Sequence, residues 1–210
     1  FEKNKDVNLI VEQGNSSTKV AVVKDWKVVA SFVYRVFNKD VLASLFRSYP
    51  LDKGIFSTVT AVDEDVVAYL ESHLSRFVFF DSQVKLPIAI EYKTPATLGK
   101  DRIAAVVGAY HYQPGRNLLV IDAGTCITYE VVEAAGRYIG GNISPGMTTR
   151  FKALEHYTSK LPYVEETDDV PCIGQSTEEA IQAGVVNGIV YEMDGFIEQM
   201  KQKYPDIFVF

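Results

Sequence analysis

The chain has 210 residues, of which 47% are hydrophobic and 23% charged, and its formal net charge is −6. This length and apolar content suffice for one large or two small globular domains. The acidic balance and the absence of a Lys/Arg block argue against a nucleic acid or an anionic membrane surface as the main partner, so we expect small-molecule ligands.

Neither a membrane span nor a secretory signal peptide is expected from the residues of this sequence. No apolar run approaches the roughly 20 residues needed to span a bilayer, and the first residues, FEKNKD, lack the apolar core of a signal peptide. Cys126 and Cys172 do not have the spacing of metal ligands, and we expect them to be reduced thiols of a cytoplasmic protein. The simpler alternative is that both are buried structural residues. The apolar run at 207–210 has no turn after it, which predicts that a further segment follows.

The first strands are expected to flank a polar turn. Apolar residues cluster over 8–23 around this turn, and another strand is expected at 27–34. The turn reads Glu12-Gln13-Gly14-Asn15-Ser16-Ser17-Thr18-Lys19. Its hydroxyl and amide side chains are hydrogen-bond donors, and Lys19 can reach a phosphate, although an ordinary exposed lysine is the alternative.

Helix and strand patterns alternate through the rest of the first half. Helix spacing occurs over 39–49 and 63–77, and β-type runs occur at 55–59 and 77–80. The second helix has one apolar face, formed by Val66, Val67, Leu70 and Leu74. This alternation indicates an α/β protein.

A polar segment at 91–102 precedes an apolar helix expected at 103–112, and Asp101 falls at the start of this helix. Asp101 is either an acid that complements the helix dipole or a carboxylate that accepts a hydroxyl proton. In the second case Arg102 pairs with substrate oxygens. Spacing alone leaves both interpretations open.

The stretch after residue 117 shows the clearest pattern. A strand at 118–121 runs into Asp122, then into Gly124 and Thr125, and a second strand follows at 127–132. A glycine lets a phosphate approach the backbone and the acid can hold a cation, although an ordinary hairpin turn is the alternative. Residues 9–16 repeat this order of apolar strand, acid, glycine and small polar residue. The repeat predicts two similar domains, at 1–114 and 115–210, around a nucleotide cleft.

The last third is expected to contain a glycine-rich ligand loop at 140–146, a helix at 147–156, a connection at 161–172 and a long helix ending near Lys203. Ser176 and Glu179 fit a capping box at the start of the long helix. Its interior glycines each cost about 1 kcal/mol relative to alanine, which predicts that another backbone packs closely there, with a second subunit as one source of it. They are Gly184, Gly188 and Gly195.

Five short motifs, in order and spacing, resemble those of the type III pantothenate kinases, which belong to the superfamily of actin and the acetate and sugar kinases. They are Glu12-x-Gly14-Asn15-x-x-x-Lys19, Gly99-x-Asp101-Arg102, Asp122-x-Gly124-Thr125, Gly140-Gly141 with Pro145-Gly146, and Gly174-x-x-Thr177. The resemblance implies a duplicated ribonuclease H-like (actin-like ATPase) fold. It also implies a homodimeric cytoplasmic kinase that phosphorylates pantothenate with ATP in the first step of coenzyme A synthesis.

The resemblance also implies roles for individual residues, with Asp101 as the proton acceptor. Pantothenate is expected to contact Tyr92, Gly99, Lys100, Asp101, Arg102 and Thr177. ATP is expected to contact Glu12, Gln13, Gly14, Asn15, Ser16, Ser17, Thr18, Lys19 and Thr125. Asp122 is expected to bind the potassium or ammonium ion that acts beside magnesium. Glu12 stands where the family usually has Asp.

Two other functions stay open from the sequence. A regulatory or accessory relative would keep the fold without catalysis, but the presence of both Asp101 and Asp122 argues against it. A hydrolase of phosphate anhydrides would use water in place of the alcohol. Tyr92 and Thr177 argue against a hydrolase if they bind pantothenate.

Overall fold

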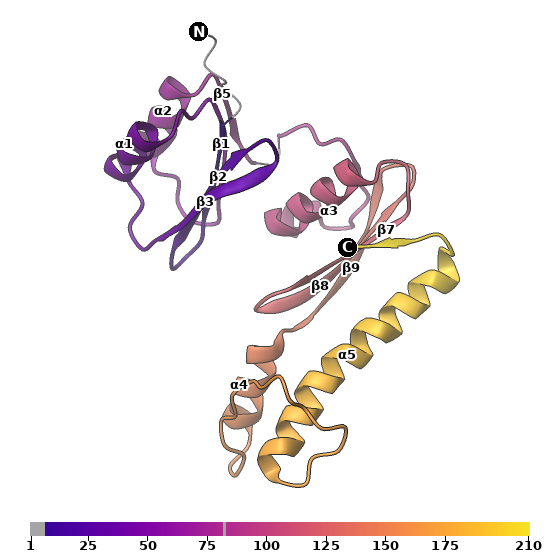
Figure 1. The fold of residues 1–210 in the computed structure, drawn as a ribbon. Coiled ribbons are helices and arrows are strands. Elements are labelled where there is room, and N and C mark those ends of the chain that lie inside the picture. Colours follow the sequence, from indigo (N-terminus) through magenta and orange to yellow (C-terminus); the bar gives the residue numbers. More distant parts are fainter. Residues whose placement is uncertain (1–6, 82) are drawn as a thin grey trace. The chain divides into compact units, whose positions relative to one another are not determined.

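The computed structural model describes residues 7–81 and 83–210, which form an α/β protein with two five-stranded sheets (Figure 1). The predicted α/β class is therefore confirmed. Backbone packing divides the chain into two compact units, one up to Lys85 and one from Leu86 to Phe210. Within the described ranges, no helix is both long enough and apolar enough to cross a membrane.

The sheet of the first unit has the strand order β3-β2-β1-β4-β5. Its strands are β1 (Val7–Gln13), β2 (Thr18–Lys24), β3 (Lys27–Tyr34), β4 (Lys53–Thr58) and β5 (Arg76–Phe79). The first three strands form an antiparallel meander, and β4 pairs parallel to β1. Asp25 and Trp26 join β2 to β3 and both have positive φ angles, which suits a two-residue hairpin turn.

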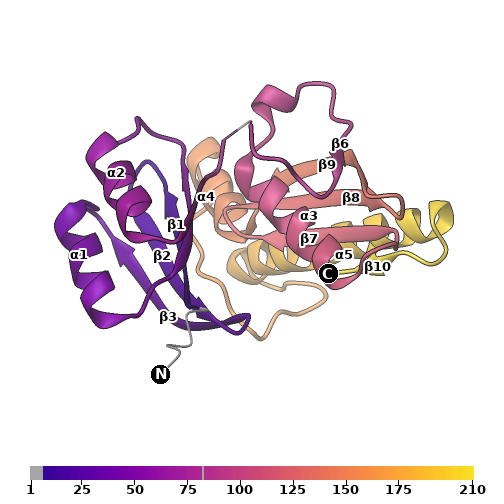
Figure 2. The same ribbon diagram turned by 90° about the horizontal axis from the view of Figure 1, so that it is seen from above.

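Helices α1 (Lys39–Ser48) and α2 (Glu64–His73) lie on one face of this sheet (Figure 2). Their buried leucine and valine side chains join the strands in one hydrophobic core. The side chains of Asn38 and Asp63 accept hydrogen bonds from the first backbone N–H groups of α1 and α2. The helix expected at 63–77 ends earlier because the chain is already extended at Leu74, before it enters β5.

The second unit repeats the topology of four strands of the first. Its strands are β6 (Ala89–Ile90), β7 (Leu118–Ala123), β8 (Cys126–Glu133), β9 (Arg137–Pro145) and β10 (Phe208–Val209), in the order β10-β7-β8-β9-β6. Again three strands form an antiparallel meander, and a parallel strand, β10, pairs with the first of them. The fifth strands differ, because β5 pairs with the parallel strand β4 whereas β6 pairs with the last meander strand, β9. The repeat seen in the sequence is thus a repeat of four strands.

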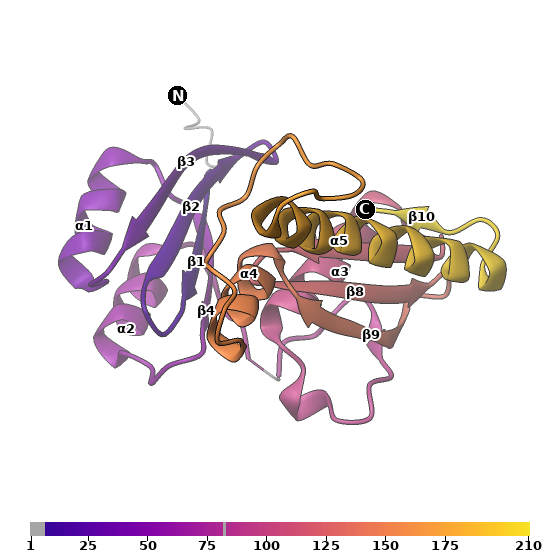
Figure 3. The ribbon, with the colours of Figure 1, turned by 90° about the horizontal axis from the view of Figure 1, so that it is seen from below.

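Helices cover both faces of the second sheet. Helix α3 (Lys100–Tyr112) packs through Ile103 and Val106 on one face. Helix α5 (Thr177–Lys203) lies along the other face, where Ile189 and Met193 contact strand side chains (Figure 3). Helix α4 (Met147–Tyr157) packs beside the first turns of α5, and a short 3-10 helix, η1 (Pro95–Thr97), precedes α3.

The expectation of a glycine-rich loop at 140–146 is wrong for all but its last residue, because β9 continues to Pro145. Gly140 has a φ of +128°, close to the point where the pairing of β8 with β9 shifts register. A Cβ on Gly141 would collide with the carbonyl group of Tyr129 on β8. These glycines therefore permit close strand pairing.

Two other expectations differ from the structure. The units divide after Lys85 and not after residue 114, because β6 pairs with β9 and α3 packs against β7 and β8. Cys126 and Cys172 are both exposed free thiols, so burial in a structural role is wrong for them.

The capping box at Ser176 is confirmed, because the Ser176 hydroxyl accepts a hydrogen bond from the Glu179 N–H at 3.2 Å.

Candidate active site

The first predicted phosphate turn joins β1 to β2. Glu12 lies opposite Lys19 in the strand register, and Lys19 Nζ is 3.9 Å from Glu12 Oε2. Both side chains are exposed, so this ion pair contributes little to stability and leaves both groups available to a ligand. The Gly14 N–H closes the turn by donating to the Ser17 carbonyl at 2.9 Å.

Gln13 ends β1, and its side-chain oxygen is buried. This Oε1 atom has no hydrogen-bond partner among the residues that the structure describes. A buried acceptor without a donor is costly, so such atoms usually meet a water or a ligand. The first turn thus offers an acceptor from Gln13 beside the charges of Glu12 and Lys19.

The second predicted turn, Gly124 with Thr125, is shorter and rests against the start of α4. The Thr125 carbonyl accepts hydrogen bonds from the Gly146 N–H at 3.0 Å and the Thr149 hydroxyl at 2.8 Å. A Cβ on Gly146 would collide with the Gly124 carbonyl, so this approach requires glycine. Asp122 is exposed on β7 next to the turn, and a cavity of about 360 Å³ adjoins Gly124.

Two helices of the second unit begin without a side-chain cap. Helices α1, α2 and α5 begin at Asn38, Asp63 and Ser176, whose side chains cap them. Helices α3 and α4 begin at Gly99 and Gly146, and no side chain in the described part of the chain caps either one. Free N–H groups at a helix start favour anionic ligands. Both uncapped starts fall in predicted ligand-binding motifs.

Asp101 lies exposed in the first turn of α3, and its neighbour Arg102 is buried. A Cβ on Gly99 would meet Asp101 Oδ1, so a larger residue at position 99 would shift this carboxylate. An exposed carboxylate in the first turn is compatible both with a proton acceptor and with an acid that complements the helix dipole.

The Arg102 guanidinium is held by residues of the sheet. Its Nε and Nη2 atoms donate to the two carboxylate oxygens of Glu130 at 2.5 and 2.8 Å, and Nη2 also donates to the Tyr138 hydroxyl at 3.1 Å. The hydrogen bond to Glu130 raises the pKa of Arg102. A side-chain hydrogen bond with Tyr92 also raises the pKa of Arg102. The Tyr92 ring lies 5.7 Å from the guanidinium carbon.

Glu130 and Tyr138 are functional candidates that sequence reasoning missed. Glu130 is a single acid inside the apolar run Ile127-Thr128-Tyr129-Glu130-Val131-Val132, which is a strand pattern for burial. A buried carboxylate needs a cationic or hydrogen-bonding partner. That signal could have identified Glu130 as a buried partner of a basic residue, although it could not say which one.

Thr177 is exposed at the first residue of α5. It borders a cavity of about 590 Å³ between α4 and α5, together with Arg150, Leu161 and Gly184. This cavity is lined by α4, α5 and Leu161, whereas Tyr92 packs beside Gly140, Arg102 and Tyr138. The structure thus groups Tyr92 with Arg102 and places Thr177 elsewhere in the unit.

Within the described ranges, no three His, Cys, Asp or Glu side chains converge as a metal cage. Magnesium usually keeps several waters and is held by one or two carboxylates together with substrate phosphates. The exposed carboxylates of Glu12 and Asp122 fit a cation that arrives with a phosphate ligand. They do not fit a cation that is enclosed by protein groups alone.

Comparisons with known proteins agree on one family. Residues 8–199 match the family described as type III pantothenate kinase. The chain is 44% identical over 204 residues to the type III pantothenate kinase of Phocaeicola vulgatus, covering 97% of this chain and 84% of that protein. It is 43% identical over 199 residues to the type III pantothenate kinase of Porphyromonas gingivalis, covering 93% and 81%.

A solved structure supports the fold. The crystal structure of a protein from Sinorhizobium meliloti, described as a candidate 2-dehydro-3-deoxygalactonokinase, aligns with a TM-score of 0.51 at 12% identity. The alignment covers 91% of this chain and 82% of that one. At this identity the likeness concerns the fold alone, which is the actin-like ATPase fold predicted from the sequence. On the family match and the identities to its relatives, this chain belongs to the type III pantothenate kinase family.

Proposed function

We propose that this chain transfers the terminal phosphoryl group of ATP to the primary hydroxyl of pantothenate, in the first step of coenzyme A synthesis. The single observation that carries the proposal is the family match over residues 8–199. Two features of the second unit support it. Asp101 is exposed at an uncapped helix start, and the neighbouring Arg102 is held in place by Glu130.

Asp101 acts as the proton acceptor in this proposal. The pantothenate hydroxyl oxygen attacks the terminal phosphorus, the bond between this phosphorus and the ADP oxygen breaks, and the hydroxyl proton passes to Asp101. Phosphoryl transfer has a loose transition state, so catalysis depends mainly on alignment and charge neutralisation. Asp101 therefore needs a fixed position more than strong basicity.

The pantothenate contacts that we propose surround this carboxylate. Tyr92, Gly99 and Lys100 contribute the loop and the helix start, and Arg102 contributes its guanidinium to a substrate oxygen. Thr177 is proposed as a further contact on the basis of its family motif. Thr177 borders a cavity that is not lined by Tyr92, Gly99 or Arg102.

ATP contacts are proposed for residues 12–19 of the first turn and for Thr125 of the second turn. The unsatisfied Gln13 oxygen and the exposed Lys19 ammonium suit a polar anionic ligand. Magnesium bound with ATP would supply neutralisation of the phosphate charge, with Glu12 as an outer or water-mediated partner. Asp122 is the proposed partner of a potassium or ammonium ion, because its carboxylate is exposed beside the second turn.

A homodimer through α5 is proposed as well. Gly184, Gly188 and Gly195 recur with Tyr191 at positions that share one helix face. Added Cβ atoms at Gly184 and Gly195 would meet nothing within 4 Å in the described chain, so packing within this chain does not explain these glycines. Sedimentation at micromolar concentration should show twice the 23.4 kDa chain mass, and a single species of the chain mass would contradict the dimer.

The test of the function is ADP release with magnesium and high potassium, with and without pantothenate. We expect release that depends on pantothenate, together with a phosphorylated product detected by mass spectrometry. Equal turnover without pantothenate would replace the proposal with the anhydride hydrolase. The absence of turnover in a protein that binds pantothenate would favour the non-catalytic relative.

A further inference from the structure

The most buried charge of the second unit lies directly behind the proposed catalytic residue. Glu130 is in the middle of β8, and its side chain is 0% exposed. Side chains alternate along a strand, and Glu130 shares the α3 face of the sheet with Val132. Arg102 reaches it from the first turn of α3, with a side chain that is 8% exposed.

The contacts leave the carboxylate a single orientation. Each Glu130 oxygen accepts from Arg102, and the Oε2 atom also accepts from the Tyr138 hydroxyl at 2.6 Å. A Cβ on Gly141 would lie 2.6 Å from Oε2, so the neighbouring strand closes the remaining side. This paired-fork geometry fixes direction as well as distance, which a single hydrogen bond does not.

The first turn of α3 needs an anchor because no side chain in the described sequence caps it. Helix ends fray when their free N–H groups lack partners. Arg102 ties this turn to the sheet through Glu130, and Asp101 is adjacent to Arg102 in the backbone. Whatever fixes Arg102 therefore also restricts where the Asp101 carboxylate lies.

We propose that Glu130 is a positioning residue: by binding Arg102 it holds the Asp101 carboxylate and the Arg102 guanidinium in the geometry that pantothenate requires. This inference rests on the proposed function. Stability alone does not account for the pair, because a buried ion pair can often be replaced by apolar residues without loss of stability. Precise placement of reacting groups, in contrast, has a large effect on rate.

The test compares Glu130→Gln with Glu133→Gln, which makes the same change three residues further along β8. Glu133 also pairs with an arginine and a tyrosine, but on the other face of the sheet and away from α3. We expect Glu130→Gln to lower kcat/KM for pantothenate by roughly 100-fold, which is the effect of moving a reacting group by about 1 Å. The KM for ATP should stay unchanged. Glu133→Gln should leave both parameters at wild-type values.

A purely structural role predicts a different result. It would reduce the folded fraction, and so apparent kcat, while kcat and both KM values per folded molecule stay at wild-type values. If Glu130→Gln does not fold, Tyr138→Phe serves instead, because it removes one donor to Glu130 and keeps the ring. We expect a loss of about tenfold or less in kcat/KM for pantothenate from this variant.

Wild-type kinetics for pantothenate in the folded variants would overturn the inference and leave the proposed function standing. If the wild-type protein itself fails to turn over pantothenate, the proposed function fails first. Titration calorimetry with pantothenate then tests the inference. Weaker binding by Glu130→Gln or Tyr138→Phe than by Glu133→Gln supports the claim that Glu130 positions Arg102. Equal binding by all variants would reject it.

Discussion

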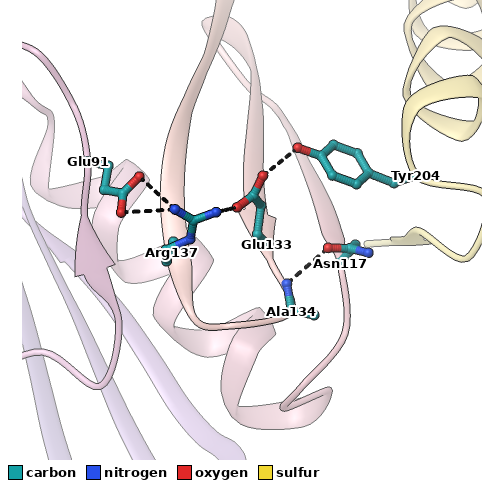
Figure 4. A network of polar contacts seen from close by, with 6 residues as sticks. All are labelled: Glu91, Asn117, Glu133, Ala134, Arg137 and Tyr204. Atoms are coloured by element: carbon teal, nitrogen blue, oxygen red, sulfur yellow. Dashed lines mark hydrogen bonds and ion pairs between the residues drawn. The ribbon is translucent and has the colours of Figure 1, made fainter.

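Strand β8 carries two groups of the same chemistry in very different surroundings. The inner group is Glu130 with Arg102 and Tyr138, and the outer group is Glu133 with Arg137 and Tyr204 (Figure 4). The carboxylate and guanidinium side chains are 0% and 8% exposed in the inner group, against 21% and 47% in the outer group. Burial, and not residue type, therefore separates their roles.

The outer group joins the margins of the second sheet. Arg137 contacts Glu133 and, at 3.4 Å, Glu91 just after β6, while the Tyr204 hydroxyl at the end of α5 donates to Glu133 at 2.8 Å (Figure 4). Close by, the Asn117 side chain accepts the Ala134 N–H at 2.9 Å. Water competes for all of these groups, so each contact is weak and tolerant of change.

The inner group has no such freedom. Water is excluded from Glu130, so its charge depends on Arg102, and a change to either residue leaves the other unpaired. Because Arg102 belongs to the helix turn that also carries Asp101, a disturbance of the pair reaches the proposed reaction centre. The buried group therefore aligns the proposed reaction centre, whereas the exposed group attaches the edges of the second sheet to one another.

The largest effect should come from the residue that the inner group holds. Asp101→Asn should lower kcat by roughly 10²–10⁴ while the melting temperature stays near that of the wild type, because the side chain is exposed. Steady-state turnover and a thermal melt measure both. An unchanged kcat would return Asp101 to the role of complementing the helix dipole.

The next largest difference between the two groups should be in the free energy of unfolding. Glu130→Ala leaves a buried guanidinium unpaired and should lower the free energy of unfolding by about 3–5 kcal/mol. The double variant Arg102→Met with Glu130→Met should recover most of that loss, because no buried charge remains. Urea unfolding provides the measurement, with Glu133→Ala as the exposed control. A loss for Glu130→Ala no larger than for Glu133→Ala would remove the distinction.

The smallest effect concerns the outer group and pH. The hydrogen bond from Tyr204, with the charge of Arg137, lowers the pKa of Glu133 below its ordinary value of 4.5. A lowered carboxylate pKa stabilises the fold above the ordinary value, and this contribution is lost as pH falls through the folded-state pKa. The melting temperature of wild type should therefore exceed that of Glu133→Gln at pH 7, and the gap should shrink below pH 4.5. A gap that is independent of pH would contradict this assignment.

Local patterns gave most of the fold. Helices and strands followed from periodicity, the Ser176 cap from residue type, and the hairpin after Asp122 from its glycine. These features depend on neighbours in sequence. The course of β9 was missed because Gly140 and Gly141 are typical of loops, whereas here they permit a register shift and close strand pairing.

The candidate site was predicted only in part. Motif spacing identified Asp101 and Arg102, and the structure places both in the first turn of α3. The partner of Arg102 was not predicted because Glu130 lies 28 residues away on a strand that only the folded sheet brings near. Whether a basic side chain faces substrate or pairs with an internal acid depends on such long-range packing.

A double-mutant cycle tests the central claim, that Glu130 acts through Asp101, most directly. It compares kcat for wild type, Asp101→Asn, Glu130→Gln and the double variant at saturating ATP and pantothenate. If Glu130 serves to place the Asp101 carboxylate, removal of that carboxylate should make Glu130→Gln nearly silent, so that the double variant is no slower than Asp101→Asn. Losses that multiply in the double variant would show that the two residues act independently, and would contradict the account.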